Sequence, residues 1–224
     1  MSDDDIRPRA VSVDCFGTLV DVDRPAEPAA AVADALRGRA VAVPEKWPEL
    51  YRTAHLDVAT GRELALDRHV DAALAAGSVD ADRETVADAV LAAFDRPPEP
   101  RPGAADALAA VDAPLGVLSN CAVPGLVERT LSRAGMAEAV GPVVTSVGCG
   151  WRKPDRRAFA AVADALDVAP AELVHVGDNA EADGGVTEVG GRFVLVGESA
   201  EDGTDDERAS LAALPEALPA EVRR

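Results

Sequence analysis

The chain has 224 residues, 48% of them hydrophobic but only 3% aromatic, so a core of useful size must be built from Ala, Val and Leu. Its net charge of −18, spread along the chain, argues against nucleic-acid binding and favours a solvated acidic surface suited to high salt, as in halophilic proteins. With no apolar stretch long enough to span a bilayer and no apolar segment after the acidic N-terminus, we expect a cytoplasmic protein with no membrane partner.

The first expected strand is 9–14, an apolar, β-branched run that ends at Asp14 and is followed at once by a Gly-Thr turn. The long stretch 26–96 has the pattern of helices, because apolar residues recur at helical spacing from Ala29 onward. No strand pattern interrupts it. Proline and glycine residues divide this stretch into about four helices.

The proline-rich run 97–103 is the clearest boundary in the chain, since proline at this density continues neither a helix nor a central strand. Beyond it, helices alternate with short apolar strands. The expected helices are 104–111, 124–134, 155–166 and 180–189, and the expected strands are 115–118, 143–147, 173–176 and 193–196. Such alternation indicates βαβ units. We therefore expect a doubly wound, Rossmann-like α/β core with a parallel sheet (1–21 and 98–224), interrupted by a helical cap (22–97).

Polar side chains follow the carboxyl ends of the strands, where ligands bind in open α/β sheets. They are Asp14, Ser119, Asn120, Lys153, Asp178 and Asp183. Three carboxylates crowded together repel one another and raise one another's pKa, which a hard divalent cation such as Mg²⁺ relieves. Asp14 can both contact the metal and attack phosphorus, while Lys153 holds phosphoryl oxygens as charge develops.

Four motifs carry a resemblance to a known family. They are Asp14-Cys15-Phe16-Gly17-Thr18, Leu118-Ser119-Asn120, Lys153-Pro154-Asp155 and Gly177-Asp178-Asn179-Ala180-Glu181-Ala182-Asp183. In order and spacing they resemble the motifs of the haloacid dehalogenase superfamily, over roughly 9–196, and the 22–100 insertion stands where that superfamily has its helical cap.

The resemblance implies a role for each matching residue. Asp14 would be the nucleophile that forms an aspartyl intermediate, Ser119 would bind phosphate, and Lys153 would neutralise Asp14 and the transferring group. Asp178 and Asp183 would hold Mg²⁺ together with Asp14, and the carbonyl oxygen of Phe16 would be a further ligand. The substrate contacts expected in addition are Thr18, Asn120 and Phe16.

Phe16 departs from the phosphatase pattern, in which a second Asp at this position acts as general acid. Phenylalanine transfers no proton, and losing a general acid typically costs about 10²–10⁴-fold in rate. Metal-independent dehalogenases carry an aromatic residue there, because halide leaves as an anion, and they bind the substrate carboxylate with a cap arginine. The arginines considered for that role are Arg37, Arg39 and Arg52.

The two carboxylates of the fourth motif favour a Mg²⁺-dependent hydrolase acting on a small phosphorylated metabolite. The alternatives are a 2-haloacid dehalogenase and a weakly active or non-catalytic relative that binds a ligand. A phosphonoacetaldehyde hydrolase would need a cap lysine, for which only Lys46 is available. His55 and His69 are cap candidates for the missing proton donor, although such residues more often lie at the surface. The expected partner is a small, anionic molecule, and the chain is expected to be a monomer or homodimer.

Overall fold

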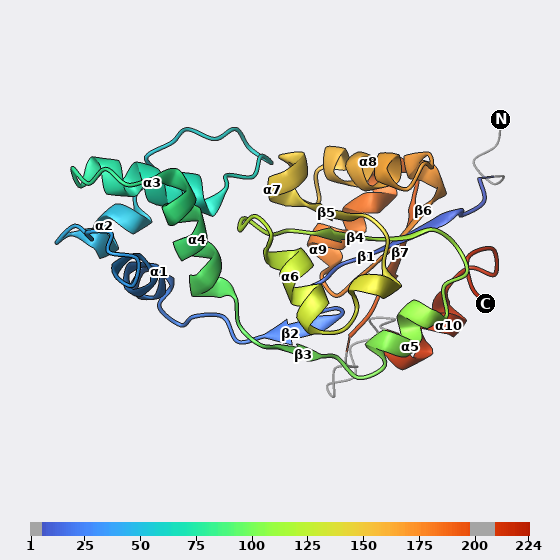
Figure 1. Ribbon diagram of the computed structural model, residues 1–224. Helices are drawn as coiled ribbons and strands as arrows, with labels where there is room; N and C mark the ends of the chain where they lie inside the picture. Colours follow the sequence, from blue (N-terminus) through green and yellow to red (C-terminus); the bar gives the residue numbers. More distant parts are fainter. Residues whose placement is uncertain (1–5, 198–208) are drawn as a thin grey trace, which may run out of the picture.

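The computed structural model describes residues 6–197 and 209–224 (Figure 1). Its centre is a five-stranded sheet in the order β5-β4-β1-β6-β7, in which every pair of neighbours is parallel. The strands are β1 (Ala10–Val13), β4 (Leu115–Ser119), β5 (Val143–Thr145), β6 (Leu173–Gly177) and β7 (Arg192–Leu195). The predicted α/β core with a parallel sheet is therefore confirmed.

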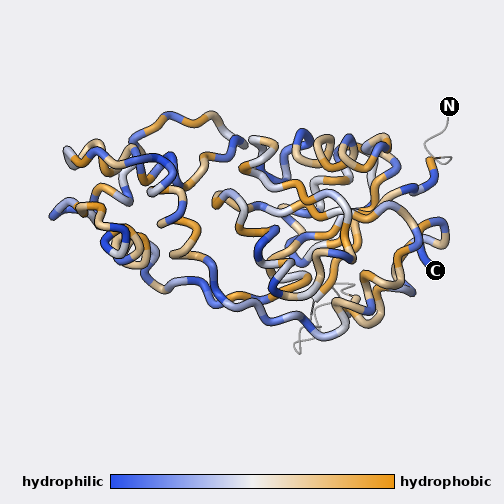
Figure 2. The backbone as a smooth tube through the Cα atoms, viewed as in Figure 1, coloured by the Kyte–Doolittle hydropathy of each residue, from blue (hydrophilic) through white to orange (hydrophobic). Residues whose placement is uncertain are grey.

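The inner strands are buried on both faces, which is why they read as nearly continuous apolar runs. All four residues of β1 and all five of β6 are buried. Figure 2 shows apolar, orange stretches of backbone in the middle of the core domain, on the right of the view. The helices around the sheet are α5 (Ala104–Ala109), α6 (Leu126–Arg133), α7 (Ser146–Cys149), α8 (Arg156–Ala165), α9 (Ala180–Asp183) and α10 (Leu214–Ala217). They cover the sheet and leave its carboxyl edge for the site.

Two expected elements differ from the structure. The strand expected over 143–147 ends at Thr145, whose hydroxyl accepts a hydrogen bond from the Gly148 backbone and so begins α7. The helix expected over 180–189 is α9 followed by a 3₁₀ segment, Gly184–Val189. The acidic loop expected after Gly197 falls largely on 198–208, outside the described residues.

A short antiparallel ribbon joins the core to the inserted helices. It consists of β2 (Val20–Val22) and β3 (Pro98–Pro100), with Val20 opposite Pro100. Prolines are tolerated here because each strand of a two-stranded ribbon has a free edge. The sequence pattern predicted only a boundary at this point, so the ribbon is an addition.

Four helices form the cap: α1 (Pro28–Arg37), α2 (Trp47–Arg52), α3 (Leu66–Ala76) and α4 (Arg83–Phe94). They gather at one end of the molecule, beyond the ribbon (Figure 1). Their apolar faces pack on one another around Val32, Leu36 and Val90, all fully buried. The second of these helices, for which helical spacing suggested 50–58, begins earlier and ends earlier, at Trp47 and Arg52, and the Trp47 indole N–H donates to the Ala29 carbonyl at 2.7 Å.

The cap also contacts the core through a loop before α3, which we call the clasp (61–63 against 150–152). The Glu63 backbone N–H donates to the Gly150 carbonyl at 3.1 Å, and the Arg152 N–H donates to the Gly61 carbonyl at 2.9 Å. The carboxylate of Glu63 accepts from the Arg152 guanidinium at 2.7 Å. Close by, the Leu66 N–H donates to the Ala122 carbonyl at 2.8 Å. The cap is thus fastened to the segment that leads directly into Lys153.

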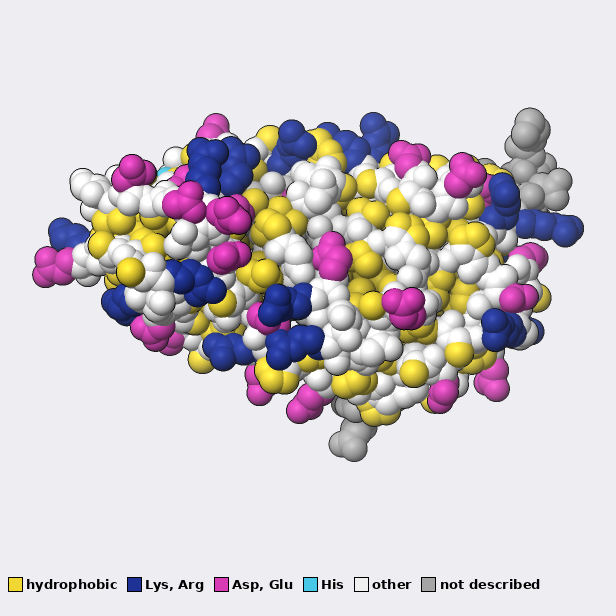
Figure 3. Space-filling model, in the orientation of Figure 1, with side chains coloured by type: hydrophobic (Ala, Val, Ile, Leu, Met, Phe, Trp, Pro, Cys, Tyr) yellow, Lys and Arg dark blue, Asp and Glu magenta, His cyan; other side chains and the backbone are white. Residues whose placement is uncertain are grey.

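The surface carries charges of both signs. Figure 3 shows acidic and basic side chains interspersed over one face, with apolar atoms between them. Across 6–197 and 209–224, every helix is too short or too polar to cross a membrane.

Asp155 caps α8, and its side chain gives a first testable prediction. Hydrogen bonds from Arg157, opposed by partial burial, lower the pKa of Asp155 from 3.8 to about 2. Replacing Asp155 by Ala should lower the free energy of unfolding by about 1 kcal/mol near neutral pH, the usual loss for an N-cap. A carboxyl whose pKa is lowered by folding stabilises above its unfolded pKa and loses this contribution as pH falls toward its folded pKa. The deficit, measured by urea unfolding, should therefore shrink between about pH 4 and pH 2. Asp155→Asn, which keeps a capping oxygen, is the control, and a deficit equal at both pH values contradicts the assignment.

Candidate active site

The strand ends converge on one pocket of about 290 Å³ at the carboxyl edge of the sheet. Its lining residues are Asp14, Phe16, Arg24, Ser119, Asn120, Arg152, Lys153, Asp178, Asn179, Ala182 and Asp183. Ser119, the last residue of β4, is buried at the floor of this group. The structure therefore brings together every catalytic and metal-binding candidate proposed from the sequence.

Asp14 directly follows β1, and its backbone N–H donates to the Val176 carbonyl at 2.9 Å, which fixes it against β6. Its Oδ1 atom lies 3.0 Å from the Lys153 ammonium nitrogen. Among the described residues, however, this buried oxygen accepts no well-aligned hydrogen bond. Asp14 is thus charge-balanced but incompletely satisfied, which suits a side chain that must bind or attack something else.

Lys153 is nearly buried, with 4% of its surface exposed. Its ammonium group donates to the Leu118 carbonyl at 2.8 Å and lies 2.6 Å from Asp183 Oδ1. The side chain of Asn120 binds the Lys153 backbone reciprocally: its oxygen accepts from the N–H at 2.8 Å and its amide donates to the carbonyl at 3.0 Å. These contacts make Asn120 a positioning residue for Lys153 as well as part of the pocket wall.

Thr18 does not line this pocket. It is fully buried, and its hydroxyl donates to Asp178 Oδ1 at 3.0 Å. The structure therefore places Thr18 behind Asp178, where it orients a carboxylate rather than contacting substrate as the sequence suggested. Gly17 permits this arrangement for two reasons. Its φ of +84° lies in the left-handed region that glycine adopts without strain, and a Cβ at this position would lie only 2.5 Å from Asp178 Oδ2 and clash with it. Burial raises the pKa of Asp178, an effect that the Thr18 hydrogen bond opposes.

Asp183 is positioned by a hydrogen bond with His175. Their contact, 3.1 Å from Nε2 to Oδ1, is completed on the other side of the imidazole by the Ser12 hydroxyl, 2.8 Å from Nδ1. Burial and the nearby Lys153 lower the pKa of His175, so the ring is neutral, its Nε2–H donates to Asp183, and Nδ1 accepts from Ser12. Burial acts to raise the pKa of Asp183, but the His175 hydrogen bond and the Lys153 charge hold it at about 2. His175 is fully buried.

The three carboxylates can together hold a cation. Asp14, Asp178 and Asp183 each offer an oxygen, and these atoms lie within 4.8 Å of one another. An all-oxygen donor set of this kind fits Mg²⁺. The donors are not equivalent, because Asp183 already accepts from Lys153 and His175 at Oδ1 and from the Asn179 N–H at Oδ2. Asp14 and Asp178 are therefore the freer ligands, and Asp183 mainly holds Lys153.

Two arginines that the sequence interpretation did not single out line the pocket, Arg24 and Arg152. Arg24 follows β2, and the pairing of β2 with β3 places it in the pocket wall. Because this placement depends on the tertiary fold, no local sequence pattern indicates it. Arg152 directly precedes the Lys153 motif, and its pairing with Glu63 of the clasp depends on the tertiary fold rather than on a local sequence signal.

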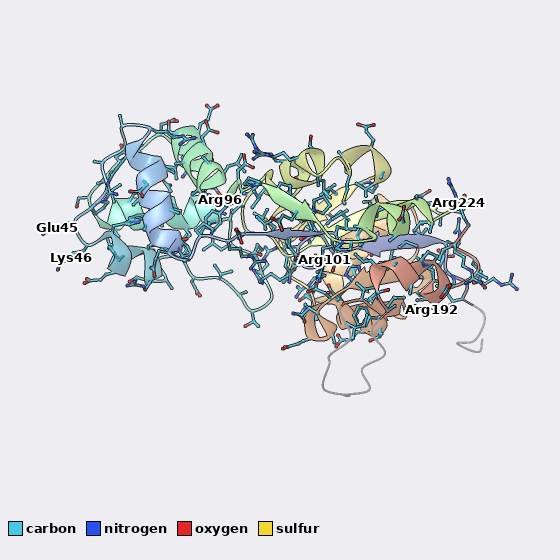
Figure 4. All side chains as sticks on the ribbon, turned by 90° about the horizontal axis from the view of Figure 1, so that it is seen from below. Glu45, Lys46, Arg96, Arg101, Arg192 and Arg224 are labelled. Carbon is cyan, nitrogen blue, oxygen red and sulfur yellow. The ribbon has the colours of Figure 1, made fainter. Side chains whose placement is uncertain are left out.

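The cap residues considered from the sequence lie elsewhere. Arg37 pairs with Asp34 at 2.9 Å, Arg39 donates to the Ala35 carbonyl, and neither is in the pocket wall, nor is Arg52. Lys46 lies at the far end of the cap, away from the core (Figure 4). It therefore cannot serve as the cap lysine that a phosphonoacetaldehyde hydrolase would need in its active site.

His55 and His69 were the cap candidates for the missing proton donor. His69 packs edge-on against Tyr51 within the cap, with His55 beside it, and neither histidine lines the pocket. Among the described wall residues, the carboxyls of Asp14, Asp178 and Asp183 are consequently the only carboxyl or imidazole groups.

Comparisons with known proteins agree with this fold. The model of the haloacid dehalogenase-like hydrolases matches residues 8–185. Among solved structures, the chain is similar to a 2-haloacid dehalogenase from Pseudomonas syringae pv. Tomato DC3000, with a TM-score of 0.67 and 24% identity over 93% of this chain and 97% of that one. It is also similar to the L-2-haloacid dehalogenase of Xanthobacter autotrophicus (TM-score 0.58, 23% identity, 93% and 97% covered).

A phosphatase stands among the similar structures as well. The phosphatase of this superfamily from Thermococcus onnurineus has a TM-score of 0.57 and 20% identity, with 95% of this chain and 99% of that one covered. These identities show a shared fold, and dehalogenases and a phosphatase share it alike. No curated protein matches the chain. The match of the family model to most of the chain, on a fold that places the four motifs in one pocket, shows that this protein belongs to the haloacid dehalogenase-like hydrolases.

Proposed function

We propose that the protein hydrolyses a small phosphorylated molecule with the help of Mg²⁺. The observation that carries this proposal is the cluster of three carboxylates, Asp14, Asp178 and Asp183, whose oxygens lie within 4.8 Å of one another, while Lys153 contacts only the first and the last of them. Without a cation, Asp178 beside Asp14 is electrostatically unfavourable. A metal-independent enzyme has no need of such a carboxylate. Arg24 and Arg152 in the wall support an anionic substrate.

The residues of the pocket divide the chemistry between them. Asp14 attacks phosphorus through its carboxylate oxygen, the bond to the leaving oxygen breaks, and water later hydrolyses the aspartyl phosphate. Lys153 and Ser119 bind the phosphoryl oxygens as negative charge accumulates. Thr18 keeps Asp178 oriented, while His175 and Asp183 keep the lysine in place. A bound Mg²⁺, held by Asp14, Asp178 and the Phe16 carbonyl with Asp183 behind them, supplies further neutralisation of phosphoryl charge.

The proposal is tested by phosphate release from a panel of phosphomonoesters in high salt, with Mg²⁺ or with a chelator. We expect turnover only with Mg²⁺. We also expect Mg²⁺ to raise the melting temperature of the wild type, since a ligand at 100 times its Kd stabilises by about 2.7 kcal/mol. Asp178→Asn should lose both responses, whereas the exposed-residue control Asp34→Asn should keep them. No turnover of any ester with Mg²⁺ would contradict the proposal.

A second function, 2-haloacid dehalogenation, is favoured by Phe16. This side chain stands in the pocket wall where a proton donor would serve a phosphatase, and halide needs no proton to leave. In that reaction Asp14 displaces halide from carbon, and Arg24 or Arg152 holds the substrate carboxylate. Halide release from 2-chloropropionate in the presence of a chelator, without phosphate release from any ester, would establish this function. Failure of both assays points to the non-catalytic alternative.

A further inference from the structure

A second cavity of about 190 Å³, which we call the side chamber, lies between the core and the cap. Its apolar walls come from four elements: Val22 of β2, Leu66 of α3, Phe94 of α4 and Leu126 of α6. Three of these side chains, those of Val22, Leu66 and Phe94, are only partly buried. Apolar surface has therefore been left facing an open space where core and cap meet, a place where ligand pockets commonly form.

The side chamber adjoins the catalytic pocket. Phe16, Arg24 and Asn120 line both cavities, so they form the junction between them. Arg24 makes no ion pair with any carboxylate in 6–197 or 209–224. The junction thus offers an unpaired guanidinium on one side and the apolar ring of Phe16 on the other. This pairing suits a molecule with an anionic head and an apolar body.

We propose that the side chamber binds the apolar body of the substrate while its phosphate lies at Asp14. The inference rests on the proposed function and narrows its substrate to phosphomonoesters of compact, apolar alcohols. An apolar cavity of about 150 Å³ holds a benzene ring, so the side chamber accepts a six-membered ring or a chain of about six carbons. Phe16 then has a positive role: it forms a wall of the specificity site in place of a proton donor.

The inference is tested by binding and by turnover in the same buffer with Mg²⁺. Calorimetry measures the Kd of straight-chain alkylphosphonates from methyl to octyl, which cannot be hydrolysed, and phosphate release measures kcat/KM for the matching alkyl phosphates. Burying one methylene is worth about fourfold in affinity. We expect Kd to fall by up to about fourfold per carbon until the chain reaches about six carbons, and then to level off.

Two variants change the size of the side chamber. Ala122→Leu adds volume to its wall and should reduce the preference for the hexyl over the methyl compound by at least about tenfold. Phe94→Ala enlarges it and should move the optimum to longer chains. The control Ala92→Leu adds the same side chain to an exposed position of α4 and should keep the wild-type preference.

The outcomes separate the two proposals. Turnover of esters with a Kd independent of chain length, or a preference that Ala122→Leu and Phe94→Ala leave unchanged, overturns the side chamber alone. Chain-dependent phosphonate binding without turnover of any ester overturns the phosphatase proposal and supports the side chamber. Neither turnover nor phosphonate binding overturns both.

Discussion

Replacing Asp14 by Asn is expected to lower the rate of hydrolysis by at least about 10³-fold, whichever leaving group the enzyme handles. The amide is a poor nucleophile and cannot form the aspartyl intermediate. The fold should survive, because Lys153 keeps its 2.6 Å contact with Asp183 and its hydrogen bond to the Leu118 carbonyl. Removing one of three crowded carboxylates should leave the melting temperature unchanged or raise it. Steady-state kinetics and thermal unfolding on the same preparation measure both effects.

Asp34→Asn is the matched control for this experiment, since Asp34 is exposed on α1 and pairs only with Arg37 among the described residues. The control should keep wild-type kinetics. A loss of less than about tenfold in Asp14→Asn, after excluding reversion of the amide to Asp by mass spectrometry, would show that Asp14 is not the nucleophile.

Replacing Phe16 by Asp is expected to raise kcat/KM for alkyl phosphates, which have poor leaving groups, by about 10²–10⁴-fold relative to aryl phosphates. In the wild type, the described wall residues include no carboxyl or imidazole outside the three clustered carboxylates, and the Lys153 ammonium is already engaged by Asp14, Asp183 and the Leu118 carbonyl. The wild-type rate should therefore fall steeply as the pKa of the leaving alcohol rises. An aspartic acid at residue 16 supplies the proton and should flatten that dependence.

Phe16→Asn separates proton transfer from shape. Both replacements remove the same ring from the junction between the two cavities, but only Asp can transfer a proton. We expect Asn to keep the steep dependence on leaving-group pKa. Equal slopes for the two variants would mean that the proton comes from elsewhere, and faster halide release than phosphate release in the wild type would favour the dehalogenase function.

The strand ends could be predicted from the sequence because their signals are local. A β-branched run that stops at Asp14, or at Asp178 after β6, is visible in a few consecutive residues, and parallel topology brings such ends to one edge. Thr18 shows the limit of that reasoning. Its hydroxyl contacts Asp178 across 160 positions of sequence, and nothing near either residue reveals the contact.

The cap was the harder part to predict, for a geometrical reason. Helical spacing tells which face of a helix is buried, but not which end of a helix group meets the core. Arg37 and Arg39 therefore looked as suitable as any other arginine, whereas the pocket contains Arg24. That placement depends on pairing Val20 with Pro100, far apart along the chain.

The clasp and the contacts beside it hold the cap on the core next to the segment that leads into Lys153. Separating cap and core there would break three backbone hydrogen bonds, those of the Glu63 and Arg152 N–H groups in the clasp and that of the Leu66 N–H beside it. It would also break the hydrogen bond from the Ser146 hydroxyl to Glu63 and one partly exposed ion pair. At roughly 0.5–1.5 kcal/mol for each hydrogen bond, these contacts oppose such a separation by about 2–6 kcal/mol. A substrate that had to enter while the cap and core were apart would bind with its apparent affinity reduced by the fraction of molecules in that form, so a mutation that loosens the clasp would tighten apparent binding.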